Sequence, residues 1–559
     1  MFIKVILLSL IAALGSVRWY RSEHRPPKVT LDYGSFIGKE QSEHNLERFY
    51  GIPFAEPPVG KLRFTNPIKP KRKYWNHDAS KHSSACPQQS LSGNASTIPT
   101  NGWLDELNLL RYFKPLGPGK EDCLTLDVTR PKGVTKSSKL PVMFFIFPGG
   151  FNLGVSWELS PKSIVKKSIS LGMPIIHVTA NHRLNLFGFL GGKEVSEAGV
   201  GNLGLKDQRL TLEWIKEYIS EFGGDPDKVT IYGESSGAIS VSHHLLAFKG
   251  QHNKLFRAAI CQSGTALPVG KLDNSENQKT FDFIASKAGN CGNAKNKLEC
   301  LRNAPFKELM RALKHFPSTF SYNAFPLPFA PSVDGNFVTE SIQYGLQKKR
   351  FAKVPFISGD VLDEGTLLAI SSYVLRTEEE LRDHISKRMG RAKKNQIDDI
   401  LKLWPQDPKL GSPYSSGSKY ALTPVYKQYS AILGDLGFVA LRRLFLRATS
   451  SLIPTWSYLD QAEQHFPVVG AYHASDIPAV FGFIRGGRKE DYQTRWISFA
   501  YKLDPNHPGL PEWKMYNQSQ MNLIIEKNGS VEMQPDNFRE EAIEYYLKNI
   551  DDLTFTSAM

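Results

Sequence analysis

Six short apolar runs, each bounded by turn residues, limit the folds open to this chain. They lie at 140–147, 173–179, 228–233, 256–263, 354–359 and 453–459. Runs of this length without alternation are typical of strands buried on both faces of a sheet. Helix-like segments separate several of them, and in one segment apolar residues recur every four positions before a Gly-Gly stop, at Leu210, Trp214, Tyr218 and Phe222. This alternation predicts an α/β fold, with a mainly parallel central sheet flanked by helices.

The run at 228–233 passes directly into an amphipathic segment through Gly233-Glu234-Ser235-Ser236-Gly237. Gly-x-Ser-x-Gly between a strand and a helix is the pattern of a nucleophile elbow. Glycine at both ends removes side chains that would collide with neighbouring backbone in so tight a turn. The pattern occurs once in the chain and predicts Ser235 as a nucleophile, with a glycine-softened helix cap as the alternative.

A nucleophilic serine needs a base, and the base needs an orienting acid. In this kind of fold the acid and then the histidine follow the serine along the chain. The carboxylates after the run at 354–359 are Asp360, Asp363 and Glu364, and the histidines further on are His384, His465, His473 and His507. His473 lies in a loop of small residues after the run at 453–459. Residue chemistry alone leaves both choices open.

Acyl transfer also requires amide donors for the developing oxyanion. Gly149 and Gly150 follow the run at 140–147, and glycine lets the backbone approach a ligand closely. The amide of Ser236, directly after the predicted nucleophile, is the third candidate. The alternative for the glycine pair is an ordinary turn.

The first residues carry a lysine, a short apolar run and then small residues, which is the pattern of a secretory signal peptide. The run is shorter than the roughly 20 residues that a membrane anchor needs. No later segment is apolar enough to span a membrane, and no linker or repeat divides the chain. We expect residues 1–16 to be a signal peptide and residues 17–559 to be a single secreted, extracellular domain without a transmembrane segment.

The cysteines and glycosylation motifs fit this location. Five cysteines allow several disulfide pairings, and Cys261 lies in an apolar run typical of the core. Acceptor triplets for N-glycosylation begin at Asn94, Asn517 and Asn528. The net charge of +14 fits either a basic extracellular protein or a polyanion binder. No nucleic-acid motif accompanies it, so we expect no nucleic-acid partner.

Seven stretches carry a family resemblance. They are YGIPFAEPPVGKLRF at 50–64, EDCLTLDV at 121–128, NHRLNLFGFL at 181–190, GNLGLKDQRLTLEWI at 201–215, GGDPDKVTIYGESSGA at 223–238, Asp-Glu-Gly at 363–365 and GAYHASDIPAVFG at 470–482. In this order they resemble the type-B carboxylesterase/lipase family, which has the α/β-hydrolase fold, and within it the fungal secreted lipases and esterases. The resemblance covers nearly the whole mature chain.

Site roles follow from the resemblance. It implies Ser235 as nucleophile, His473 as general base and acid, and Glu364 as the orienting carboxylate. It implies that the amides of Gly149, Gly150 and Ser236 form the oxyanion hole, with Glu234 and Ser263 close behind the site. It pairs Cys86 with Cys123 and Cys291 with Cys300. The implied mechanism needs no metal and no other cofactor.

Two further features concern the surroundings of the site. In fungal relatives the first disulfide encloses a mobile lid, here 86–123, whose segment WLDELNLLRYF fits an amphipathic helix that opens in transient contact with a lipid interface. The alternative is a static surface loop. The chain also departs from the family pattern, with Pro148 in place of glycine, Ser236 in place of alanine and Asp127 in place of asparagine.

We therefore expect a secreted serine carboxylic-ester hydrolase that acts on small-molecule or lipid esters through an acyl-enzyme. The first alternative is a catalytically inactive, cholinesterase-like binding or adhesion module, against which the intact serine, glutamate and histidine positions argue. The second is a peptidase on the same fold. The residues leave the acyl-chain length of the substrate open.

Overall fold

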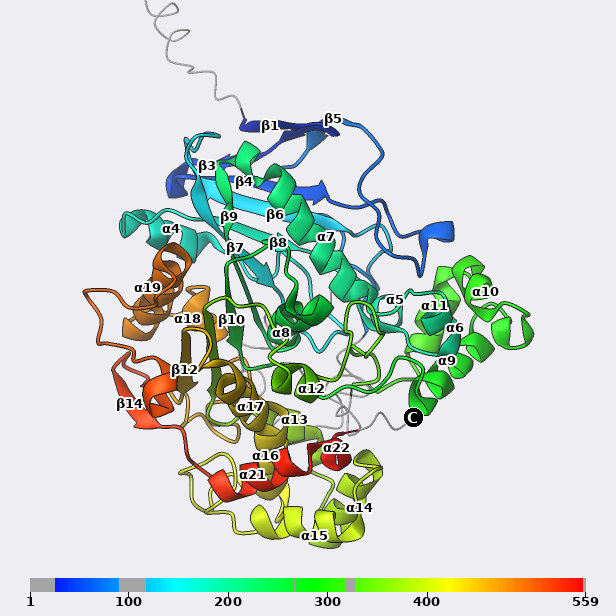
Figure 1. Ribbon diagram of the computed structural model, residues 1–559, viewed down its shortest axis with the longest axis vertical. Helices are drawn as coiled ribbons and strands as arrows, with labels where there is room; N and C mark the ends of the chain where they lie inside the picture. The colour runs from blue at the N-terminus through cyan, green and yellow to red at the C-terminus, as the bar shows by residue number, and fades with distance from the viewer. Residues whose placement is uncertain (1–25, 90–116, 266, 318–326, 556–559) are drawn as a thin grey trace, which may run out of the picture.

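The computed structural model describes residues 26–89, 117–265, 267–317 and 327–555 (Figure 1). Within them an 11-stranded sheet has the order β14-β13-β12-β11-β10-β9-β7-β8-β6-β4-β3. Neighbouring strands from β8 to β13 are parallel, and antiparallel strands lie at both edges. The strands are β3 Lys39–Gln41, β4 Leu46–Pro53, β6 Thr125–Pro131, β7 Leu140–Ile146, β8 Ile176–Ala180, β9 Gly224–Glu234, β10 Ala258–Gln262, β11 Phe356–Val361, β12 Thr455–Asp460, β13 Met521–Ile525 and β14 Val531–Pro535.

The six predicted runs correspond to strands β7 to β12, which are adjacent in the sheet. The prediction of a mainly parallel α/β sheet is confirmed. The antiparallel edge strands were not predicted, and neither was a separate three-stranded sheet of β1 Lys28–Leu31, β2 Gly34–Ile37 and β5 Tyr74–Asp78. The outermost strands β3 and β14 are short and partly exposed, so they lack the continuous apolar pattern of a buried strand.

Side chains of the central strands alternate between two apolar layers. On β7, Phe144 and Ile146 pack with α7 Leu203–Tyr218 and α8 Ser236–Gly250. Met143 and Phe145 lie on the opposite face, against α4 Lys162–Ser170, α18 Ile477–Val480 and α19 Gly487–Lys502. The four-residue repeat predicted the helix that is α7. Both faces of the sheet are therefore covered.

The remaining helices gather in two further clusters (Figure 1). One contains α5 Asn185–Phe189, α6 Lys193–Glu197, α9 Ser275–Lys287, α10 Lys297–Asn303 and α11 Phe306–Leu313. The other contains α13 Thr366–Ala369, α14 Glu378–Arg388, α15 Lys394–Leu403, α16 Tyr426–Gly434, α21 Glu540–Lys548 and α22 Ile550–Leu553, seen at the bottom of the view. Short helices α12 Ile342–Gln347 and α20 Tyr516–Ser519, together with the longer α17 Ala440–Thr449, complete the α-helices of the described residues.

Parts of the chain that carry sequence predictions lie outside the described residues. These are the signal peptide at 1–16, Asn94 and most of the expected lid, including the segment WLDELNLLRYF. In the ranges that are described, none of the helices has both the length and the apolar character needed to cross a bilayer.

A buried ionic network joins α17 Ala440–Thr449 to the sheet. Arg442, which is fully buried, donates from Nε to Asp360 Oδ2 at 2.6 Å and from Nη1 to Asp536 Oδ2 at 2.7 Å. Asp360 lies on β11, and Asp536 follows β14. Asp536 also pairs with Arg443 at 2.9 Å, so removing Arg442 leaves Asp360 as the uncompensated buried charge.

We predict that Arg442→Met lowers the free energy of unfolding by about 3–5 kcal/mol, because Asp360 loses its counter-charge and Asp536 keeps only Arg443. Arg447→Met, on the same helix but in a partly exposed pairing with Glu540, is the control and should cost less than about 1 kcal/mol. Urea unfolding followed by circular dichroism measures both. An equally small loss of unfolding free energy in both variants would contradict the prediction.

Candidate active site

The predicted nucleophile lies in a strained turn between β9 and α8. Ser235 has φ 54° and ψ −125°, a left-handed conformation that is costly for a residue with a side chain. A Cβ on Gly237 would lie 2.0 Å from the carbonyl oxygen of Ile146, and one on Gly233 would lie 2.5 Å from the carbonyl carbon of Gly237. Both positions therefore require glycine, and the turn is pressed against the end of β7.

The structure brings Ser235, His473 and Glu364 together from three segments. His473 Nε2 lies 2.9 Å from Ser235 Oγ, and its Nδ1 lies 2.5 Å from Glu364 Oε2. The other oxygen of Glu364 accepts a hydrogen bond from the amide of Val361 at 2.9 Å. Glu364 and His473 are buried, whereas Ser235 is only half-buried. This is the geometry of an activated serine.

The rejected carboxylates have other partners. Asp360 pairs with Arg442, as described above. Asp363 accepts hydrogen bonds from Ser412 and from the amides of Tyr414 and Ala471. Both side chains therefore serve contacts away from the imidazole, and Glu364 alone of the three reaches it.

The rejected histidines are also placed elsewhere. His384 lies 3.0 Å from the hydroxyl of Tyr429, and His507 accepts a hydrogen bond from the amide of Gly509. His465 is exposed on a loop. The alternatives that residue chemistry left open are thus separated by geometry.

A second carboxyl group faces the imidazole. Glu234 Oε1 lies 3.5 Å from His473 Nε2, and both Glu234 oxygens are buried without a hydrogen-bond partner among the described residues. Burial raises the pKa of Glu234 well above its ordinary value. Burial opposes a charged imidazole, yet the pKa of His473 is raised, because the charges of Glu234 and Glu364 and the hydrogen bond to Glu364 outweigh it.

The predicted oxyanion donors lie beside the turn. Gly149 has φ 131° and Gly150 has φ 60°, in the loop that follows β7. A Cβ on Gly149 would lie 2.0 Å from the carbonyl oxygen of Leu153, so the loop needs glycine there. The amides of Gly149, Gly150 and Ser236 donate to no main-chain oxygen within the described ranges. Among the described residues, these three donors therefore have no main-chain acceptor.

Two further residues, Ser263 and Phe438, lie close to the site. Ser263, expected behind the site, is fully buried with φ 49°, and its hydroxyl has no partner among the described residues. Phe438 was not predicted, and its ring lies 4.7 Å from the His473 ring, centroid to centroid. It belongs to a π-helical turn, Asp435–Val439, between α16 and α17. Such turns have no local sequence signal but are frequent at functional sites.

The structure contains both expected disulfides, Cys86–Cys123 and Cys291–Cys300, and Cys261 is a buried free thiol. Asn517 and Asn528 are exposed, as acceptors of glycans must be, and their glycosylation stays a prediction. Within the part of the chain that is described, no group of three or more His, Cys, Asp or Glu side chains is arranged to hold a metal ion.

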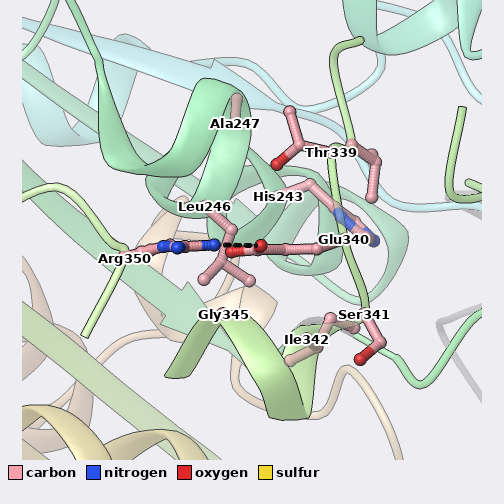
Figure 2. A pocket seen from close by; sticks show the side chains of 10 residues that line it. His243, Leu246, Ala247, Thr339, Glu340, Ser341, Ile342, Gly345 and Arg350 are labelled. Carbon is pink, nitrogen blue, oxygen red and sulfur yellow. Dashed lines mark hydrogen bonds and ion pairs between the residues drawn. The ribbon is translucent and has the colours of Figure 1, made fainter. Parts of the chain in front are cut away.

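A separate small cavity lies near the far end of α8 (Figure 2). It has a volume of about 10 Å³, and His243, Thr339 and Glu340 contribute to its wall. Arg350 Nη1 donates to Glu340 Oε2 at 2.7 Å across it. Apolar side chains such as Leu246 and Ile342 line it as well, whereas Ser235, His473 and Glu364 do not.

The sheet topology, the strained serine turn and the adjacent histidine and glutamate are those of an α/β-hydrolase. Comparison with known proteins agrees. The model of the carboxylesterase family matches residues 25–545, and the chain belongs to this family of carboxylic ester hydrolases.

The relatives support this assignment over nearly full length. The chain is 36% identical to Lipase 4 of Diutina rugosa, covering 96% of each protein, and 38% identical to Secreted lipase 1 of Botryotinia fuckeliana, covering 90% of each. Among solved structures, Aspergillus niger EstA matches the fold with a TM-score of 0.79 at 24% identity, covering 95% of this chain and all of that one. The expected resemblance to fungal secreted lipases is confirmed.

We predict that Gly237→Ala disrupts the turn, because the new Cβ would lie 2.0 Å from the Ile146 carbonyl oxygen. Hydrolysis of a nitrophenyl ester should fall by at least ~10-fold, since a displacement of about 1 Å costs up to ~10²-fold. Gly509→Ala is the control, because its Cβ would meet no atom closer than 3.5 Å. Full activity of Gly237→Ala would contradict this account of the turn.

Proposed function

We propose that the protein is a secreted serine ester hydrolase that acts on lipid esters, with Ser235 as nucleophile, His473 as general base and acid, and Glu364 as orienting carboxylate. The observation that carries the proposal is the continuous contact from Ser235 Oγ through the His473 ring to Glu364. Its place at the end of a parallel strand is where active sites of such sheets lie.

The proposed reaction has two halves. Ser235 Oγ attacks the acyl carbon while His473 Nε2 takes its proton, and Glu364 holds the Nδ1 proton and stabilises the imidazolium. The amides of Gly149, Gly150 and Ser236 stabilise the oxyanion. The alcohol leaves with the proton from His473. Water then attacks the acyl-enzyme in the same way, releasing the carboxylic acid and restoring Ser235.

The substrate class and the location rest on separate observations. Lipase 4 of Diutina rugosa and Secreted lipase 1 of Botryotinia fuckeliana are lipases by name, which favours lipid esters. Two disulfides favour an oxidising, extracellular location, and the second of these relatives is named as secreted. The proposal includes residues 1–16 as the signal peptide that directs export.

We predict that Ser235→Ala abolishes ester hydrolysis, lowering kcat by ~10⁴-fold or more, because the acyl-enzyme can no longer form. The variant should unfold close to the wild-type temperature, since it loses only the contact of one half-buried hydroxyl with His473. A fluorophosphonate should label the wild type at residue 235 and leave the variant unlabelled. Labelling of the wild type at another residue, or turnover retained by Ser235→Ala, would contradict the assignment of Ser235 and favour the binding-module alternative.

We predict that nitrophenyl esters are hydrolysed with kcat/KM rising with acyl length, and faster in an emulsion than in monomeric solution, because a lipase site gains from buried apolar acyl surface. The matching nitroanilides should react far more slowly. A preference for the amides would indicate the peptidase alternative. A preference for short acyl chains without interfacial gain would indicate a non-lipolytic esterase.

A further inference from the structure

We infer that Asp363 is a positioning residue, whose carboxylate holds the loop of His473 against the turn of Glu364. The inference rests on the proposed function and adds to it a residue that does not touch the reacting atoms. Glu364 and His473 are 109 residues apart in the chain, so their 2.5 Å contact depends on what fixes the two segments to each other.

Asp363 joins these segments at two points. Its amide donates to the carbonyl oxygen of Ala471 at 2.9 Å, and its Oδ2 accepts from the amide of Ala471 at 2.9 Å. Asp363 and Tyr472 also form an isolated parallel bridge. Ala471 is two residues before His473, and Asp363 is directly before Glu364. The pairing therefore sets the separation of the imidazole and its carboxylate.

The same carboxylate reaches a third segment. Its Oδ1 accepts from the Ser412 hydroxyl at 2.7 Å and from the Tyr414 amide at 2.8 Å. Asp363 is fully buried, so all of its hydrogen bonds are made inside the protein. An ionised carboxylate is an acceptor only, which suits a group that faces three donors.

Gly470 keeps the space for this contact. It has φ 58°, and a Cβ there would lie 2.2 Å from Asp363 Oδ2. The loop thus comes so close to the carboxylate that only glycine fits beside it. A second link, from the Thr366 hydroxyl to the carbonyl oxygen of Val469 at 2.7 Å, holds the start of the loop but not the residues next to His473.

Asp363→Asn tests the inference because it keeps size and changes one acceptor into a donor. The amide oxygen can still serve Ser412 and Tyr414, but the NH₂ group then faces the N–H of Ala471. We expect kcat for a nitrophenyl ester to fall by roughly 10–100-fold, with KM within about twofold, because the imidazole is displaced from its carboxylate.

The pH profile of kcat/KM distinguishes displacement of the His473 imidazole from a simple loss of folded protein. On the acid side kcat/KM rises as the imidazole loses its proton, and the titratable groups that face the imidazole are Glu364, Glu234 and Asp476. A looser contact with Glu364 stabilises the imidazolium less, so the acid limb should move to lower pH in Asp363→Asn. Partial unfolding would lower the profile without moving it.

Two other variants keep the test decisive. Asp504→Asn makes the same chemical change in an exposed turn, where Asp504 accepts from the Asn506 amide at 2.9 Å, and should leave kcat and the profile unchanged. Gly470→Ala places a methyl group against the carboxylate from the opposite side. It should reproduce the lower kcat and the shifted limb, and it decides the question if Asp363→Asn does not fold.

The outcomes are distinguishable. Suppose that the wild type is active and that Asp363→Asn or Gly470→Ala keeps the wild-type kcat and an unmoved acid limb. This result would overturn the positioning role and leave the proposed function intact. A wild type that neither hydrolyses esters nor reacts with a fluorophosphonate at Ser235 would overturn the proposed function itself, before any variant is compared.

Discussion

The parallel pairing of β9, β10, β11 and β12 is the constraint on which the rest of the structure depends. It places the carboxyl ends of these strands at one edge of the sheet. β9 ends directly before Ser235, and β11 ends at Val361, shortly before Glu364. β12 ends at Asp460, so a much longer segment leads to His473. The strands alone fix the first two side chains, whereas the third depends on contacts made by its own loop.

The central fold was readable from the sequence because its strands are buried on both faces. Strand β7, for example, is apolar nearly throughout and buried over Pro141–Ile146, so it appears as an unbroken run. Strand β14 is half-exposed and contains Glu532 and Gln534, and no such run marks it. The edges of the sheet were missed for this reason. Their pairing is decided by neighbouring strands rather than by their own composition.

The residues of the site, too, could be predicted only in part from the sequence. Ser235 was predicted because the steric demands of its turn are local and leave two glycines in the sequence. Glu364 could not be chosen over Asp360 by residue chemistry, since the difference is that Arg442, 82 residues away, pairs with Asp360. Phe438 left no signal at all, because a π-helical turn depends on how α16 and α17 pack. Contacts between distant segments decided what patterns could not, except where the family resemblance supplied the answer.

Two carboxyl groups, those of Glu364 and Glu234, flank the imidazole of His473, and they differ in their hydrogen bonds. Glu364 has an amide donor on one oxygen and the ring on the other, which suits an anion. Glu234 has no hydrogen-bond partner among the described residues, and burial raises its pKa, which favours the neutral acid. The carboxyl group that is held by hydrogen bonds thus lies on the Nδ1 side of His473, whereas the one on the Nε2 side has none among the described residues. When the ring is neutral, that asymmetry favours the proton on Nδ1 and leaves the Nε2 lone pair toward Ser235, so the serine proton has one acceptor and one path.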